Sequence, residues 1–315
     1  MPDPTLDTTA PAKIILFGEH AVVYGEPAIA VPVASLQASA AIQPSEDGFK
    51  IIAHDLDAAI VRYDPQLIKE PLQRTLTLLQ QHTGQSLPDV EIHLRSTIPM
   101  ASGLGSGAAI STALARAVSA AMESPLSNET LNGIIFEVEK IHHGTPSGID
   151  NTVIVYEQPI YYVRNQPIER LKIEQPFKLI IGDTGKKALT HVAVGDVRKL
   201  MEAQPEQTQQ RIGAIGEIAT AARAAIEHGH IADLGQLMHE NHRLLKELTV
   251  SSSDLNRFVE AALEAGAIGA KMSGGGRGGN MIALVDERHS QAVMQALRDA
   301  GAVNLIETIV CEAKN

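Results

Sequence analysis

The sequence predicts an α+β protein built from two domains. The chain has 315 residues, which is enough for two cores of ordinary size. Strand-like and helix-like segments alternate along it, without an internal repeat, a long linker or a low-complexity segment. From Phe177 onward the pattern runs strand, helices, two strands, helix and strand, which is typical of a separate α+β domain. We therefore expect one domain at residues 1–176 and a second at residues 177–315.

Hydrophobic periodicity predicts the individual elements. In the first domain we expect strands at 13–17, 28–42, 49–52 and 91–94, helices at 65–82, 108–122 and 127–142, and a hairpin made by 153–156 and 160–163. In the second domain we expect strands at 177–181, 267–272, 281–285 and 304–310, and helices at 192–203, 207–228, 234–248, 255–265 and 290–300. Ser127 is the expected cap of its helix, and residues 1–10 are expected to be a frayed tail.

Composition excludes several classes of protein. The chain carries 26 Lys and Arg against 37 Asp and Glu, a formal charge of −11, which disfavours binding along a nucleic-acid backbone. It has no run of 18 apolar residues and no signal-peptide pattern at its start, so we expect neither membrane insertion nor secretion. Cys311 is the single cysteine, which fits a reducing compartment. A cytoplasmic enzyme is the expected class.

The segment at 98–109 is the most informative part of the chain. Gly103, Gly105 and Gly107 come directly before an alanine-rich helical run. Glycines let the backbone wrap closely around an anion, and the helix behind them offers unpaired amide groups and the positive end of its dipole. Together these features predict a phosphate-binding loop. Two other interpretations stay open for this segment alone, a dinucleotide fingerprint ending at Ala108 and a set of tight turns.

A second constellation is the pair of carboxylates Glu139 and Asp150, which flank a loop at 144–148. Across such a loop one carboxylate is able to hold a divalent cation while the other orients a hydroxyl nucleophile. We expect Asp150 to emerge from the loop directly before a strand. A helix end with solvated charges, in which the aspartate caps the turn, explains the pattern equally well.

Lys13 stands at the head of an apolar strand, where a charge is costly unless it is paired. A carboxylate such as Asp150 would remove that cost and build a catalytic pair. The alternative is a strand-end lysine whose ammonium group lies in water.

Residues 271–280 contain a second glycine run, with five glycines in the six positions 274–279 and Arg277 among them. A backbone of this kind is built for close approach, and a second anion-binding loop would suggest a site shared between domains. A flexible hairpin tip is the alternative. Two weaker patterns are set aside: His239 and His242 are expected on a solvated helix face, and Ser102 and Ser106 lack the partners of a nucleophilic serine.

Four segments together resemble the GHMP small-molecule kinases, and within that superfamily the mevalonate kinase family. They are Lys13 with the Gly-Glu-His-Ala-Val-Val-Tyr-Gly run at 18–25, the Gly-Leu-Gly-Ser run at 103–106, the His-Gly-Thr-Pro-Ser-Gly-Ile-Asp-Asn run at 143–151, and the late glycine run. The resemblance extends from Lys13 to about Leu284. It implies an N-terminal domain like ribosomal protein S5, a ferredoxin-like C-terminal domain, and transfer of phosphate from ATP to the C5 hydroxyl of mevalonate.

The resemblance also implies roles for individual residues. Asp150 matches the catalytic aspartate and Lys13 its partner, while Glu139 matches a Mg²⁺ ligand to which Ser106 could add an oxygen. The implied ATP-binding residues are Ala101, Ser102, Gly103, Leu104, Gly105, Ser106 and Gly107. The implied substrate-binding residues are Glu19, His20, Thr190, Gly274 and Arg277.

Two positions depart from the family pattern. Gly107 stands where the family usually has a second serine that supplies an oxygen to Mg²⁺, and Arg277 stands where the family usually has no arginine. Its guanidinium could meet phosphate, meet the substrate carboxylate or point to solvent. The alternatives to a mevalonate kinase are a related kinase for another alcohol or a phosphorylated substrate, and a ligand-binding relative without catalysis. A monomer and a homodimer are both compatible with the sequence.

Overall fold

The computed structural model describes residues 7–55, 59–100, 102–143, 146–188 and 190–312, with no account of the side chains of His142 and His143. Two units share these residues. The first takes its described residues from Met1–Ala12, Leu36–Met100 and Gly105–Glu157, and the second takes them from Lys13–Ser35, Ala101–Leu104 and Gln158–Asn315. Strands β1 (Asp7–Phe17) and β2 (Ala28–Pro44) run through both units. The domain boundary expected at residue 176 stays a prediction.

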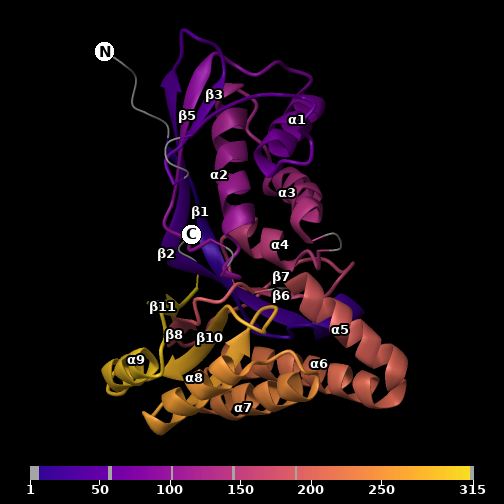
Figure 1. The fold of residues 1–315 in the computed structure, drawn as a ribbon, viewed down its shortest axis with the longest axis vertical. Helices are drawn as coiled ribbons and strands as arrows, with labels where there is room; N and C mark the ends of the chain where they lie inside the picture. Colours follow the sequence, from indigo (N-terminus) through magenta and orange to yellow (C-terminus); the bar gives the residue numbers. More distant parts are fainter. Residues whose placement is uncertain (1–6, 56–58, 101, 144–145, 189, 313–315) are drawn as a thin grey trace. The chain divides into compact units, whose positions relative to one another are not determined.

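In the first unit, helices pack on a mixed sheet. The strand order is β4-β3-β5-β2, with β3 (Lys50–Ala53) parallel to β5 (Val90–Ser96) and antiparallel to β4 (Ala59–Arg62). Helix α2 (Ser106–Ala121) lies against β5 and contacts α1 (Pro71–Thr83), α3 (Asn128–His143) and α4 (Ile149–Tyr156) (Figure 1). Half of its buried residues are alanine, and these small side chains let its neighbours approach closely.

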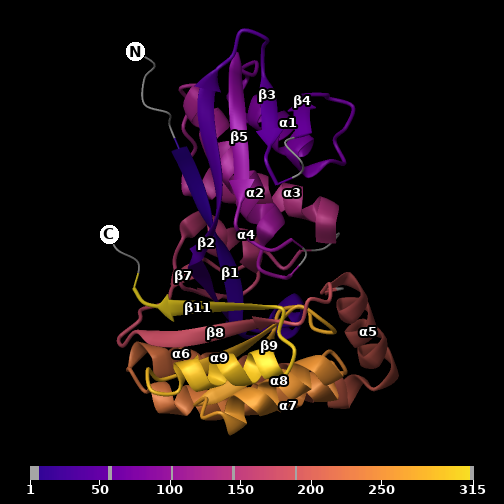
Figure 2. The same ribbon diagram turned by 60° about the vertical axis from the view of Figure 1, so that its left-hand side comes forward.

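In the second unit, a four-stranded antiparallel sheet has the order β11-β8-β10-β9. Its strands are β8 (Phe177–Asp183), β9 (Gly269–Ser273), β10 (Asn280–Val285) and β11 (Asn304–Val310). Helices α7 (Ile231–Glu247), α8 (Ser253–Glu264) and α9 (Ser290–Asp299) lie on one face of it, and α6 (Pro205–Glu227) packs on α7 (Figure 2). The unit also holds η1 (Ala21–Tyr24), α5 (Thr190–Ala203), and β6 (Ile160–Tyr162) with β7 (Glu169–Arg170) beside the start of β2.

A row of polar residues marks one end of this four-stranded sheet. Asn280 of β10 lies in register with Asp183 of β8 and with Ser273 of β9. All three side chains are buried. The loops that follow β8 and β9 therefore leave the sheet side by side, which places the late glycine run next to residues 184–188.

Most of the expected elements are confirmed, and two expectations are wrong. The expected hairpin strand at 153–156 is helix α4, which is buried on nearly every side and so shows no one-sided periodicity. The expected frayed tail contains the first four residues of β1, from Asp7 to Ala10, and its residues 1–6 lie outside the described chain. Ser127 does cap α3, since its Oγ accepts a hydrogen bond from the amide of Thr130 at 3.2 Å. Among the described helices, none is both long enough and apolar enough to cross a bilayer.

Close contact between α7 and β9 depends on a missing side chain. A Cβ atom on Gly235 would lie 2.2 Å from the carbonyl oxygen of Ile268, and one on Gly269 would lie 2.5 Å from the Cα of Gly235. We therefore expect Gly235→Ala to lower the free energy of unfolding by about 1–3 kcal/mol, because the helix must move off the sheet. Urea unfolding measures this change.

Gly213 of α6 is the matched control, because a Cβ there meets nothing within 4 Å. Gly213→Ala should stabilise the protein by roughly 0.5–1 kcal/mol through helix propensity alone. Equal effects of the two substitutions would contradict the packing argument.

Candidate functional site

Backbone groups of other segments pack directly against the late glycine run. A Cβ on Gly276 would lie 2.0 Å from the carbonyl oxygen of Val250, and one on Gly278 would lie 2.7 Å from that of Lys186. A Cβ on Gly279 would lie 2.9 Å from the carbonyl oxygen of Ser102. Gly274 differs, because its Cβ would meet nothing within 4 Å. The run is therefore a close-packed junction of three loops, with open space only at Gly274.

His20 lies in this junction with an unusual backbone. Its φ is 62°, in the left-handed region that costs a non-glycine residue free energy, and its side chain is 5% exposed. Nε2 donates a hydrogen bond to the carbonyl oxygen of Gly275 at 3.1 Å, which leaves Nδ1 as an acceptor. Burial lowers the pKa of His20 from 6.5 to about 4, so the ring is neutral at pH 7. Among the described residues, Nδ1 has no hydrogen-bond partner.

Glu19, next to His20, forms a buried ion pair with Lys271 of β9. The side chains are 1% and 0% exposed, and Nζ of Lys271 contacts Oε1 of Glu19 and donates to the carbonyl oxygen of Met272 at 2.7 Å. Burial raises the pKa of Glu19 and lowers the pKa of Lys271, while their mutual attraction opposes both changes. The pair fixes the turn that carries His20 to the strand that leads into the glycine run.

Thr190, the first residue of α5, packs against the same loop. A Cβ on Gly275 would lie 2.4 Å from Thr190 Oγ1 and 2.9 Å from Thr190 Cα. Gly275 therefore touches His20 through its carbonyl group and Thr190 through its Cα. The structure brings together four of the five expected substrate-binding positions, Glu19, His20, Thr190 and Gly274, around one peptide segment; their contact with a substrate stays a prediction.

Residues 102–104, the first described part of the expected phosphate loop, also belong to the second unit. The amide of Lys13 donates to the carbonyl oxygen of Leu104 at 3.0 Å, and Asn280 Nδ2 donates to the carbonyl oxygen of Ser102 at 2.7 Å. Gly103 has a φ of 89°, which explains the glycine. Lys13 is 3% exposed, so the alternative of an ammonium group in water is wrong. Ala101, also expected to bind ATP, lies outside the described residues.

The rest of that loop and both expected carboxylates lie in the first unit. Gly105, with a φ of 78°, precedes α2, whose first turn contains Ser106 and Gly107. Glu139 of α3 is 3% exposed. The helix start and the buried carboxylate are the features that a phosphate loop and a metal ligand require.

Asp150 lies in the first turn of α4, behind the left-handed cap Gly148, and not before a strand as expected. The neighbouring Asn151 donates from Nδ2 to Asn132 Oδ1 of α3 at 2.6 Å, which fixes the start of α4 on α3. Amide groups at a helix start stabilise a negative charge. Gly144 and Thr145 of the preceding loop lie outside the described residues, and the pairing of Asp150 with Lys13 stays a prediction.

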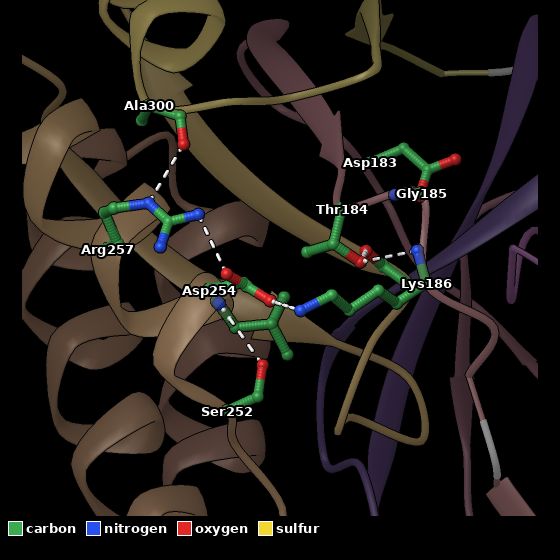
Figure 3. A network of polar contacts seen from close by, with 10 residues as sticks. Asp183, Thr184, Gly185, Lys186, Ser252, Asp254, Arg257 and Ala300 are labelled. Carbon is green, nitrogen blue, oxygen red and sulfur yellow. Dashed lines mark hydrogen bonds and ion pairs between the residues drawn. The ribbon is translucent and has the colours of Figure 1, made fainter.

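Two cations near the late glycine run are paired with aspartates. Nζ of Lys186 contacts one carboxylate oxygen of Asp254 in α8, and Arg257 Nη2 donates to the other at 2.8 Å (Figure 3). Nη1 of Arg277 contacts Asp196 of α5. The contact of Arg277 with substrate stays a prediction, and its guanidinium has a protein partner.

Sequence reasoning missed two buried residues of the junction. Lys271 carried the same signal as Lys13, a lysine in an apolar strand, and was not singled out. His242 was expected on a solvated face, which is wrong: it is 6% exposed, accepts from the amide of Met272 at Nδ1 and donates to Asn256 Oδ1 from Nε2. The apolar periodicity of α7 carried a signal for this, because Met238 and Leu245 lie four residues before and three residues after His242 on the same buried face.

The buried ion pair yields a stability test. Lys271→Met should lower the free energy of unfolding by about 3–5 kcal/mol, because Glu19 is left buried without a counter-charge. Lys186→Met, which breaks the exposed pair with Asp254, should cost less than about 1 kcal/mol. Adding Glu19→Gln to Lys271→Met should recover most of the loss in urea unfolding. A loss no larger than that of the control would contradict the pairing.

His242 yields a pH test. Burial lowers its pKa from 6.5 to about 4, so the folded protein binds fewer protons than the unfolded chain between these values. Stability from this group is complete above about pH 6.5 and falls by up to about 3 kcal/mol as the pH drops towards 4. Urea unfolding of His242→Gln should show a shallower acid slope than the unsubstituted protein, and His239→Gln, an exposed site on the same helix, should not. Parallel slopes in all three proteins would contradict a buried neutral His242.

Comparison with known proteins places this arrangement in a family. The model of the GHMP kinases N terminal domain matches residues 69–158, and that of the GHMP kinases C terminal domain matches residues 222–303. A mevalonate kinase of Pyrococcus horikoshii is 35% identical, with 96% of this chain and 94% of that protein covered.

Solved structures agree with this placement. L. major mevalonate kinase in complex with R-mevalonate superposes with a TM-score of 0.84 at 28% identity over 100% of both chains. The Methanococcus jannaschii mevalonate kinase superposes with a TM-score of 0.85 at 25% identity, with 98% of this chain and 99% of that chain covered. The chain therefore has the two-domain GHMP kinase fold and belongs to the mevalonate kinase family of GHMP kinases.

Proposed function

We propose that this enzyme transfers the γ-phosphoryl group of ATP to the C5 hydroxyl of mevalonate. The observation that carries the proposal is the neutral, buried His20, whose free Nδ1 lone pair lies in a loop junction shared with Glu19, Thr190 and Gly274. A buried acceptor without a partner calls for an explanation, and a substrate hydroxyl would supply one. The proposal is supported by membership of the mevalonate kinase family over 96% of the chain.

The substrate side of the site suits an alcohol. His20 Nδ1 accepts a hydrogen bond from a substrate hydroxyl, and Thr190 offers a hydroxyl group that both donates and accepts. The open space at Gly274 admits the carbon chain. Neutral hydrogen-bonding groups of this kind select a substrate with hydroxyl groups over one that lacks them.

The paired cations argue against a phosphorylated substrate. A pocket for phosphomevalonate needs basic side chains, and Lys186, Lys187 and Arg277 are the candidates near the junction. Asp254 neutralises Lys186, and Asp196 neutralises Arg277. Lys187 is exposed. Two of the three candidate cations are thus already paired with aspartates, which favours the unphosphorylated alcohol.

In the transfer, Asp150 accepts the proton of the C5 hydroxyl. The substrate oxygen forms its bond to the γ-phosphorus as the bond between that phosphorus and the leaving ADP oxygen breaks. Lys13 stabilises the charge on the phosphoryl group and on Asp150. Alignment and charge stabilisation supply most of the acceleration in such reactions.

ATP and Mg²⁺ are expected to bind at the start of α2. Residues 102–107 supply backbone amides for the phosphates, and the buried Glu139 carboxylate with Ser106 Oγ fits the hard oxygen ligands of Mg²⁺. Within the described chain, no group of three or more His, Cys, Asp and Glu side chains is arranged to hold a metal ion. Mg²⁺, when bound, offsets the negative charge of the phosphates. We further propose that the enzyme is cytoplasmic and is a monomer or a homodimer.

A coupled ADP-release assay tests the proposal. Mevalonate with ATP and Mg²⁺ should give turnover and a product whose phosphate is on C5, while phosphomevalonate, galactose and homoserine should give little. Activity on another alcohol with none on mevalonate would move the assignment to a related kinase. Calorimetric binding without ADP release would indicate a ligand-binding relative.

Asp150→Ala should lower kcat by about 10²–10⁴-fold with little change in the KM for ATP, because it removes the proton acceptor. Asp233→Ala is the control, since Asp233 is an exposed acid in the first turn of another helix, α7. Near-normal turnover of Asp150→Ala would contradict the assignment of Asp150 as the proton acceptor.

A further inference from the structure

The proposed function leaves the strained backbone of Arg277 unexplained. Arg277 has a φ of 59°, a left-handed conformation that disfavours any residue with a side chain. Glycine occupies both neighbouring positions, Gly276 and Gly278, and glycine would adopt this conformation without cost. Strain of this kind persists where the surroundings hold it in place, and it marks positions whose side chain has a task.

Three contacts hold Arg277. Its amide donates to the carbonyl oxygen of Val250 at 2.8 Å. Its Nε and Nη2 lie 3.4 Å and 3.3 Å from the carbonyl oxygen of Thr249, which is itself left-handed with a φ of 63°. The third contact is the ion pair between Nη1 and Asp196, with side chains 32% and 25% exposed. The guanidinium is thus aimed at α5.

Helix α5 packs on α6 but buries few side chains of its own. Only Ala193 and Val197 are buried among its residues, and Gly195 lies in its middle, where glycine lowers helix stability. A helix with so few buried apolar side chains opens readily. Apart from this core, α5 meets the glycine run at two points, Thr190 against Gly275 and Asp196 against Arg277.

We propose that Arg277 and Asp196 form a clasp that fixes α5, holds Thr190 on Gly275 beside His20, and thereby sets the affinity for the alcohol substrate. Both are positioning residues, and neither touches the reacting atoms. The effect on substrate affinity rests on the proposed function, whereas the effect on α5 does not.

The same carboxylate provides an internal control. Lys199 also pairs with Asp196, at 3.0 Å, but its side chain is 78% exposed and lies on α5 itself. Loss of Lys199 removes an ion pair from Asp196 without releasing the helix from the loop. A clasp therefore requires Arg277 and not Lys199.

The experiment compares Arg277→Gly, Asp196→Asn, their combination and Lys199→Ala. Arg277→Gly relieves the left-handed strain, so folding should be preserved. We expect each clasp variant to raise the KM for mevalonate by about 3- to 10-fold with kcat within about twofold, and the double variant to add little. Hydrogen exchange of the amides at 190–203, measured without substrate, should accelerate by a similar factor. Lys199→Ala should change neither quantity.

The outcomes separate three explanations. If Arg277→Gly raises the KM for mevalonate but Asp196→Asn does not, Arg277 contacts the substrate directly and the clasp is refuted. Unchanged exchange at 190–203 in both variants would also refute it, whatever the kinetics. If the unsubstituted enzyme does not phosphorylate mevalonate, the proposed function fails while hydrogen exchange still decides whether the clasp holds α5.

Discussion

The buried contact between Glu19 and Lys271 is the constraint on which the second unit's loops depend. Both side chains are almost fully removed from water, so displacing either one would leave the other buried without a counter-charge. Lys271 lies two residues before the last residue of β9, and Glu19 directly precedes His20. Gly18 allows the turn, because a Cβ there would lie 2.4 Å from the carbonyl oxygen of Pro27. The strained His20 is therefore held from both sides, by its turn and by the glycine run.

The glycines of 274–279 serve packing as much as ligand binding. Backbone carbonyl groups from three separate segments occupy the places where side chains would be, at Gly276, Gly278 and Gly279. Such contacts leave little freedom, because protein interiors tolerate almost no overlap. Gly274 is the exception, with open space beside it. A glycine-rich loop thus combines a rigid base with one accessible position, which suits a site whose donors must be placed in advance.

The sequence predicted much of this, and its failures have physical causes. Long helices with one apolar face, such as α7 and α8, were predicted within a few residues because their periodicity records which side is buried. Helix α4 was missed because Val153, Ile154 and Val155 are all buried, so β-branched residues without periodicity mimic a strand. The partners of Glu19 and His242 were missed because they lie 252 and 30 residues away, and local patterns carry no record of such contacts.

Charge pairing bears on how an acidic chain could bind the anion that the proposed function requires. With a formal charge of −11, the chain has more acids than bases, and around the junction Lys271, Lys186 and Arg277 each face a carboxylate. Cations engaged in this way are poor partners for a second anion, since the first carboxylate must be displaced or shared. In the proposed site, backbone amides would therefore supply much of the attraction for phosphate, because they carry no side-chain charge to be neutralised. The helix that begins at Ser106, behind glycines at 103 and 105, supplies that kind of donor. The glycine spacing at 103–107 therefore suits the proposed phosphate site, where backbone amides would add to the charge of Lys13 while the three paired cations contribute little.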